Sequence, residues 1–282
     1  MKVLPFTIPK PKNDALILQE DKQPLFYNLF HQHEEIQLSV IKKGEGSLIV
    51  GDAVHSFQAG ELIVLGSNVP HVFKSTTLKD SPSHMLTVFF KKDSFGNDFF
   101  ETEELKSLDS FFEKATQSFK ISDSSEEIIA SFEALFSVSK LERFILFLQL
   151  LKAINESLFI PLSSFAQTKK YSDNEGRRMG IIYNFSMNHF REKITLPQIA
   201  SEAAMTPQAF CRYFKKRTRK TYIEFLNEIR IEEACNLLKK HPEMSIIEIA
   251  ESSGFNNISN FHRKFKEQKG LRPLQYQKQS QL

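Results

Sequence analysis

The sequence predicts a multidomain protein in which an N-terminal all-β barrel is followed by helices and then by an all-α domain with two helix-turn-helix motifs joined by a linker helix. Three observations lead to this prediction. Apolar residues alternate with a period of two in the first third of the chain and follow a helical period from about residue 124 onward. The charge is acidic in the N-terminal part and basic in the C-terminal part, and the basic part contains an internal repeat.

The composition is that of an ordinary globular protein, with 282 residues of which 41% are hydrophobic and 25% are charged. It excludes the collagen-like, disordered and disulfide-scaffold classes. Prolines and lysines interrupt the first dozen residues, so we expect no secretory signal. The longest apolar run, Phe144 to Leu151, is too short to span a bilayer, and no membrane association is predicted. We therefore expect a cytoplasmic protein in which Cys211 and Cys235 are reduced.

The barrel is predicted from short apolar alternations between about residues 32 and 90. Ile36, Leu38 and Val40 alternate with polar residues, and glycine-containing turns separate this segment from the next apolar stretches. Many short strands with regular turn signals are typical of a sandwich or a barrel. We assign residues 1–95 to this domain.

Residues 96–160 are predicted to form a helical extension, and the polar residues 161–176 a linker. The helix from about Leu141 to Leu158 is apolar nearly all round, so it must be covered on more than one side. It is a candidate homodimer interface in which Phe147 and Leu151 take part. Burial within one chain is the alternative.

Charge divides the chain at the end of this linker. Residues 1–176 contain 18 Lys and Arg against 24 Asp and Glu, a net of −6, whereas residues 177–282 contain 19 against 10, a net of +9. A basic region without a single Asp favours a polyanionic partner, and a solvated basic face is the alternative.

The basic region contains two copies of one unit. Ile199-Ala200 recurs as Ile249-Ala250, and Phe210-x3-Phe214-Lys215 recurs as Phe261-x3-Phe265-Lys266. Each copy has a capped short helix, a turn and a second helix, which is a helix-turn-helix layout. A continuous helix from Tyr222 to Lys240 is predicted to join the copies.

In such a motif the second helix reads bases in the major groove with its exposed face, while phenylalanines hold the helix on the domain. The spacing of the buried positions leaves one polar face on each second helix. The predicted DNA-binding residues are Gln208, Cys211, Arg212 and Lys215 in the first copy, and Ser259, Asn260, His262, Arg263 and Lys266 in the second.

These motifs resemble the DNA-binding domain of AraC/XylS transcription regulators over about 90 residues. The resemblance implies a sequence-specific regulator that binds double-stranded DNA and RNA polymerase, acts as an effector-responsive activator, is not an enzyme and uses no cofactor. Arg219 stands where the family usually has Gly in the first copy, and Arg272 and Gln277 are further departures. The matching residues are Ile194, Ala200, Phe210, Arg212, Phe214, Lys215, Leu226, Arg230, Ala234, Leu237, Leu238, Ile249, Ala250, Gly254, Phe255, Phe261, Arg263, Phe265, Lys266, Gly270, Pro273 and Tyr276.

The N-terminal region resembles the cupin-like sensor barrel that many AraC relatives carry, through His31, His33, Gln37 and His71 together with its glycines. Residues 31, 33 and 37 have the same parity, so on a strand they project to one face. In metal-binding cupins the position of Gln37 is a carboxylate, and a neutral amide is a poor ligand for Zn, Fe or Mn.

Three interpretations of this histidine group remain. It lines a pocket for a small-molecule effector, such as a sugar or a related metabolite; it forms a metal site of three His and Gln37; or its histidines are structural. The main alternative for the whole chain is a cupin metalloenzyme fused to a basic domain, and an architectural DNA-binding protein is a third.

Overall fold

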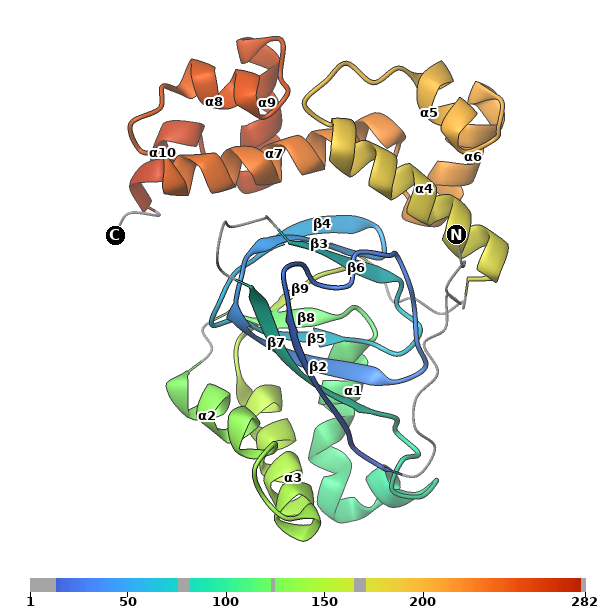
Figure 1. The fold of residues 1–282 in the computed structure, drawn as a ribbon, viewed down its shortest axis with the longest axis vertical. Coiled ribbons are helices and arrows are strands. Elements are labelled where there is room, and N and C mark those ends of the chain that lie inside the picture. Colours follow the sequence, from blue (N-terminus) through green and yellow to red (C-terminus); the bar gives the residue numbers. More distant parts are fainter. Residues whose placement is uncertain (1–13, 76–81, 123–124, 165–170, 280–282) are drawn as a thin grey trace. The chain divides into compact units, whose positions relative to one another are not determined.

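The computed structural model describes residues 14–75, 82–122, 125–164 and 171–279 (Figure 1). The chain forms two compact units, one of residues 1–51 and 57–176 and the other of residues 52–56 and 177–282. Among the described residues, no helix is both long and apolar enough to cross a bilayer.

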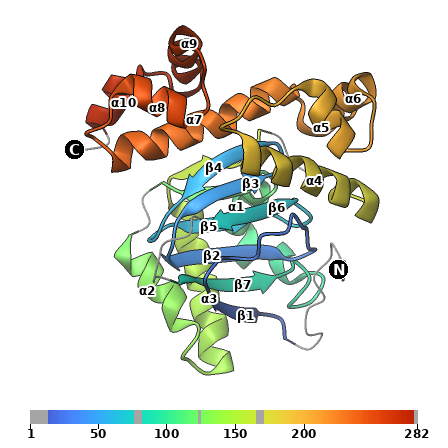
Figure 2. The same ribbon diagram turned by 45° about the horizontal axis from the view of Figure 1, so that its top comes forward.

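The N-terminal unit is built on β-sheets, as the alternating sequence predicts (Figures 1 and 2). A six-stranded antiparallel sheet has the order β1-β7-β2-β5-β8-β9, and a three-stranded sheet has the order β4-β3-β6. The strands are β1 (Ile17–Gln23), β2 (Ile36–Lys43), β3 (Gly46–Val50), β4 (Ala53–Phe57), β5 (Leu62–Leu65), β6 (His71–Ser75), β7 (Ser83–Phe90), β8 (Phe119–Ile121) and β9 (Phe159–Pro161).

Strand β2 shows how the alternation positions the site. Leu38 and Val40 belong to a core cluster shared with the helices of this unit, whereas Ile41 belongs to a second cluster inside the barrel. Gln37 has the parity of Ile41 and lines a pocket inside the barrel. The expected parity of Gln37 relative to Leu38 and Val40 is therefore present in the structure.

Helices cover one face of the six-stranded sheet. They are η1 (Phe99–Glu101), η2 (Glu103–Leu108), α1 (Asp109–Ala115), α2 (Glu126–Ala134) and α3 (Lys140–Glu156). A capping box between Ser139 and Glu142 starts α3. The extension from residue 96 to 160 also supplies β8 and β9, which its helical period did not indicate.

The α3 helix buries one face and exposes the other. Phe147 and Leu151 are fully buried in the core, so the expectation that they lie at a subunit interface is wrong. Their side chains are needed to cover the sheet. By contrast, Leu141 is 70% exposed and Ile145 is 50% exposed.

Every described element between residues 177 and 279 is a helix, and these helices contain both helix-turn-helix motifs, in agreement with the predicted fold class. Side-chain caps from Thr195, Thr206, Thr221, Ser245 and Asn257 start five of its helices. The helices are α4 (Asp173–His189), α5 (Leu196–Glu202), α6 (Pro207–Thr218), α7 (Tyr222–Lys240), α8 (Ile246–Ser252), α9 (Ile258–Lys269) and α10 (Pro273–Gln279). Helix α4 starts inside the segment expected to be a linker, of which residues 165–170 lie outside the described residues.

The two motifs share one turn geometry. In the first, Ala204 has φ 51° and the amide of Met205 donates to the Ala200 carbonyl at 2.9 Å. In the second, Gly254 has φ 91° and the amide of Phe255 donates to the Ala250 carbonyl, also at 2.9 Å. The sequence repeat is therefore a repeat of backbone structure.

Candidate functional site

Helix α6 presents the polar face that the sequence predicts. Thr206 caps it, and Pro207 occupies its first turn, where no intrahelical amide bond is needed. Phe210 and Phe214 are fully buried against the domain. This burial leaves four side chains exposed on the outer face, namely Gln208, Cys211, Arg212 and Lys215.

Helix α9 repeats this arrangement. Asn257 caps it, and Phe261 and Phe265 are fully buried. Ile258, the first residue of α9, is 37% exposed. Ser259, His262, Arg263 and Lys266 are exposed, and Asn260 is half-buried.

The two outer faces differ in charge. Helix α6 contains four cationic residues and no acidic one. In α9 the Arg263 guanidinium donates to Glu267 Oε1 and to Asn260 Oδ1, both at 2.8 Å, and Lys264 donates to Glu267 Oε2 at 2.7 Å. The hydrogen bond from Lys264 is the main reason that the pKa of Glu267 is lowered. The four-residue spacing of Arg263 and Glu267 on one helix is the sequence signal for this ion pair.

Helix α7 joins the motifs over 19 residues, which corresponds to about 28 Å at ~1.5 Å per residue. The Tyr222 hydroxyl and the Ser186 hydroxyl are 2.9 Å apart in the core between α7 and α4. Burial raises the pKa of Tyr222 to about 12. Cys235 is buried in the core of the second motif, and this burial raises the pKa of its thiol to about 12.

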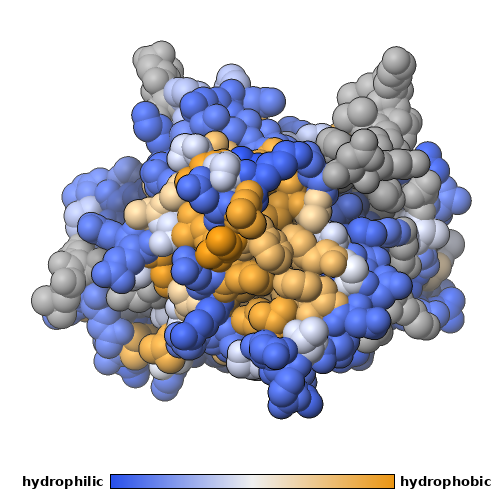
Figure 3. Space-filling view, turned by 90° about the horizontal axis from the view of Figure 1, so that it is seen from below, coloured by the Kyte–Doolittle hydropathy of each residue, from blue (hydrophilic) through white to orange (hydrophobic). Residues whose placement is uncertain are grey.

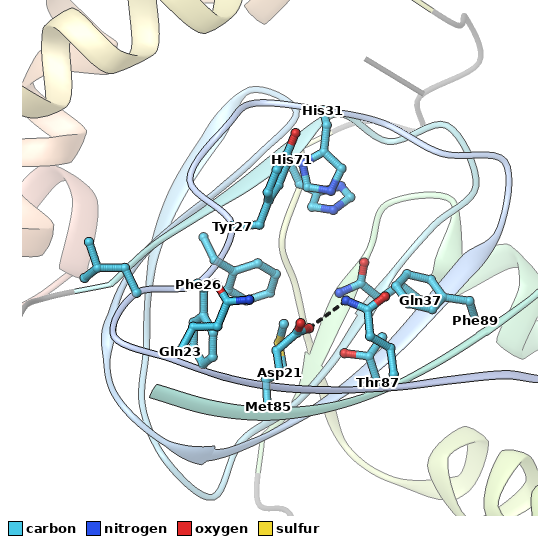
Figure 4. A pocket seen from close by; sticks show the side chains of 13 residues that line it. Asp21, Gln23, Phe26, Tyr27, His31, Gln37, His71, Met85, Thr87 and Phe89 are labelled. Atoms are coloured by element: carbon cyan, nitrogen blue, oxygen red, sulfur yellow. Dashed lines mark hydrogen bonds between the residues drawn. The ribbon is translucent and has the colours of Figure 1, made fainter. Parts of the chain in front are cut away.

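A pocket of about 310 Å³ lies in the barrel (Figure 4). Its aromatic walls include Tyr27 and Phe89, and its polar groups include Asp21, Gln37 and His71. The described lining contains no lysine or arginine. The remaining lining residues are Gln19, Gln23, Leu25, Phe26, His31, Phe73, Met85 and Thr87.

His31, His33 and His71 come together in the buried part of the barrel, as the sequence predicts. A bridge pairs His31 with His71, and one ring nitrogen from each of the three lies within 4.8 Å of the others. Each Nδ1 faces a backbone carbonyl at 2.8 Å: that of Leu29, Glu35 and Val69 in turn. A carbonyl can only accept, so each Nδ1 carries the proton. In a neutral ring this leaves the lone pair on Nε2.

Gln37 connects this histidine cluster to a buried hydroxyl chain. The side-chain oxygen of Gln37 is 3.0 Å from His33 Nε2, and its amide donates to Ser39 Oγ, which is 3.0 Å from Thr87 Oγ1. A His33 ring with acceptors at both nitrogens is an imidazolium, whereas rotation of the Gln37 amide by half a turn suits a neutral ring. Three neutral imidazoles are a donor set that fits a divalent ion such as Zn²⁺ once the Gln37 amide turns away from the lone pair of His33 Nε2.

Comparison with known proteins gives two domain matches. Residues 199–279 match the family described as a helix-turn-helix domain, and residues 23–89 match the family described as a cupin domain. The transcriptional regulator YdeC of Bacillus subtilis is 36% identical over 104 residues, which cover 37% of this chain and 35% of YdeC. The transcriptional activator RhaS of Mannheimia succiniciproducens is 25% identical over 264 residues, which cover 91% of this chain and 92% of RhaS.

The chain belongs to the AraC/XylS family of DNA-binding transcription regulators. Among solved structures, the DNA-binding domain of AdpA in complex with a target DNA covers 38% of this chain and 91% of its own, at 24% identity and a TM-score of 0.34. ToxT from Vibrio cholerae covers 93% of this chain and 97% of its own, at 17% identity and a TM-score of 0.37. The alignment with YdeC spans about a third of that protein.

For this AraC-family protein, sequence reasoning found the histidine cluster and the two polar helix faces but missed most of the pocket. Tyr27 comes from the segment before the first histidine, and its ring lies edge-on to His31 with centroids 4.9 Å apart. Asp21 and Thr87 come from β1 and β7, which pair in antiparallel register. Only the sheet order brings these side chains to one cavity, and no local pattern reports it.

Proposed function

We propose that this AraC-family protein is an effector-responsive transcription activator whose two reading helices, α6 and α9, enter adjacent major grooves of one duplex. The observation that carries the proposal is the equivalence of Arg212 and Arg263. Both side chains are exposed, and each lies on a helix with its own pair of buried phenylalanines at equivalent positions. The roughly 28 Å length of α7 approaches the ~34 Å that separates successive major grooves on one side of a duplex. The same proposal assigns residues 1–95 to sensing, 96–160 to dimerisation, 161–176 to a linker and 177–282 to DNA.

In vitro selection of duplexes from a random pool tests the DNA-reading part. The expected result is a site with two sub-sites about one helical turn apart. Arg212→Ala and Arg263→Ala should each weaken binding to the selected site by about 1 to 3 kcal/mol if these side chains read bases. Equal losses on selected and random DNA would assign them to phosphate contacts instead.

The pocket of about 310 Å³ is the proposed effector site. Its aromatic walls, uncharged amides and single carboxylate suit a ligand that offers hydroxyl groups to hydrogen bond, such as a sugar or a related metabolite. A lining without described cations gives no charge compensation to an anionic ligand. The effector can regulate only if it binds one state of the protein more tightly than another.

Ligand titrations with a panel of neutral sugars, sugar acids and sugar phosphates test this assignment. Calorimetry should detect binding among the neutral compounds, and the DNA affinity of the full chain should change with the ligand that binds. His71→Ala should abolish the response, because His71 lines the pocket beside His31. A normal response in a folded His71→Ala protein would place the effector elsewhere.

A second candidate for the same cluster is a divalent metal site, favoured by the three histidines whose Nδ1 protons are all committed to backbone carbonyls. Such outer hydrogen bonds hold metal-ligating histidines in one tautomer. His31, His33 and His71 would hold the ion. Metal analysis of the purified protein, and Zn²⁺ or Co²⁺ titration after chelation, separate this candidate from an organic effector.

A homodimer through α3 completes the proposal. Figure 3 shows apolar side chains gathered on the face seen from below in Figure 1. On α3 the exposed apolar residues are Leu141 and Ile145, and Phe144 and Leu148 are half-buried beside them. A second copy would cover them, and linking two DNA-binding units would raise the effective concentration of the second half-site.

A further inference from the structure

The two helix-turn-helix motifs of the C-terminal unit meet at a joint that lies on α7. Helix α7 belongs to both motifs, because Phe225 and Leu226 are buried near its start and Ala234 and Leu238 are buried near its end. A connecting helix fixes the distance between two motifs. It does not by itself fix how far one motif is rotated relative to the other.

Arg230, at the middle of α7, contacts both motifs. Its Nε donates to the Phe190 carbonyl at 2.7 Å and its Nη2 donates to the Glu192 carbonyl at 2.8 Å, both in the loop between α4 and α5 of the first motif. The same guanidinium lies 5.9 Å from the ring centroid of Phe255, in the turn of the second motif. A planar fork that satisfies two carbonyls and stacks near an aromatic ring is a property of arginine that lysine lacks.

Gly254 brings the two backbones into contact at the same place. A Cβ on this residue would lie 2.5 Å from the Phe190 carbonyl oxygen, 2.9 Å from Arg191 Cα and 3.0 Å from Arg230 Nε. The corresponding residue of the first motif is Ala204, whose Cβ is accommodated at φ 51°. The turns of the two motifs therefore have the same hydrogen bonds, but Ala204 is exposed, whereas the Gly254 turn packs against the loop between α4 and α5.

We propose that Arg230 and Gly254 form a rigid joint that fixes the register of α6 relative to α9, so that Arg230 is a positioning residue for DNA sites of one spacing. An ion pair between Arg191 of the first motif and Glu233 of α7 lies at the same junction. This inference rests on the proposed reading of two grooves. Each added base pair moves a sub-site by about 3.4 Å and rotates it by about 34 to 36°, which a rigid pair of helices does not follow.

The first test measures spacing tolerance with the full chain. The probes are duplexes recovered by selection from a random pool, with one or two base pairs added or removed between the sub-sites, and duplexes that keep a single sub-site. Wild-type protein should lose at least about tenfold in affinity for each altered spacing, the scale of a lost base contact. In Arg230→Lys and Arg230→Ala proteins that loss should fall to about threefold or less, with single-sub-site affinity unchanged.

Lys239→Ala is the matched control, because it also removes one positive charge from α7 but lies exposed at the far end of the helix. It should keep the wild-type spacing dependence. A folded Arg230→Ala protein with the wild-type spacing dependence would overturn the proposal, and so would a wild-type protein that binds two sub-sites at any spacing. A selected site with only one sub-site would instead refute the reading of two grooves.

The second test needs no DNA. Spin labels at the exposed Cys211 of α6 and at Gln268→Cys of α9 report the distance between the two reading helices, and the buried Cys235 is protected from labelling. The distance distribution should be narrow in the otherwise unaltered protein and clearly broader in Arg230→Ala and Arg230→Lys. Equal widths in all three proteins would show that α7 alone sets the register.

Discussion

The two reading helices end in equivalent left-handed caps, one of which carries a side chain that this conformation disfavours. Arg219 ends α6 with φ 57° and ψ 6°, and Gly270 ends α9 with φ 73° and ψ −12°. Each cap amide donates to the carbonyl four residues earlier, at 2.9 Å from Arg219 to Lys215 and at 3.0 Å from Gly270 to Lys266. The caps therefore differ mainly in the presence of a Cβ, which predicts opposite effects of substitution at the two sites.

The magnitude follows from two opposing terms. A left-handed conformation costs a residue with a Cβ roughly 1 to 2 kcal/mol, and the greater freedom of glycine in the unfolded chain offsets about 0.4 to 1 kcal/mol of this. A Cβ at Gly270 would meet no heavy atom within 4 Å, so no clash adds to the cost of Gly270→Ala. Arg219→Gly should therefore be about 0.5 to 1 kcal/mol more stable than Arg219→Ala, and Gly270→Ala less stable than wild type by a similar amount.

Differential scanning calorimetry of the full chain measures these stability differences, because it separates the unfolding transitions of the two units where they unfold independently. For a unit of about 100 residues, the expected shifts are roughly 3 to 6 °C in Tm, upward from Arg219→Ala to Arg219→Gly and downward for Gly270→Ala. The comparison with alanine removes the contribution of the Arg219 side chain beyond Cβ. An Arg219→Gly protein that melts below Arg219→Ala would refute the reasoning.

Four further results are expected. Glu267→Gln should strengthen binding to duplex DNA by about two- to fivefold in fluorescence anisotropy, since it removes the only acidic side chain of α9 and releases the guanidinium paired with it; unchanged affinity would show that α9 does not approach the phosphates. Ile145→Glu should give a folded protein that sediments as a monomer at micromolar concentration, and a wild-type monomer would contradict the dimer through α3. Burial raises the pKa of both Cys235 and Tyr222 to about 12, above their values in the unfolded chain. The free energy of unfolding should therefore be greatest below pH 9 and fall as the pH rises toward 12, and in Cys235→Ala this fall should be shallower. Gln37→Glu supplies the missing carboxylate next to the three histidines and should tighten Co²⁺ binding by at least about tenfold in optical titrations, whereas equal affinities would place no metal at this cluster.

The helical part of the fold follows from local signals. The predicted helix from Tyr222 to Lys240 has the same bounds in the structure, because Thr221 and Glu224 form a capping box and Pro242 follows its end. The buried phenylalanine pairs were equally readable, since each pair is one helical turn apart. Local sequence signals are therefore sufficient to predict these helices and their buried faces.

Pairings between distant segments could not be read in the same way. Strands β8 and β9 are each three residues long, and Phe119 and Phe159 reach the sheet only because the segment between them folds back as helices. The pocket likewise combines Asp21 with Thr87 across the pairing of β1 and β7. Such short strands carry too few residues for a period of two to distinguish them from turns.

The two copies of the internal repeat differ in the hydrogen bonds of their equivalent arginines. Arg212 and Arg263 occupy the same position on their helices, yet only Arg263 is held by Glu267 and Asn260. To contact a base, Arg263 must break or share its hydrogen bonds to Glu267 and Asn260. DNA binding by α9 therefore has a free-energy cost that binding by α6 does not have. The first motif should therefore supply most of the attraction to any duplex, while the second adds affinity only on sites whose bases replace the Glu267 and Asn260 bonds.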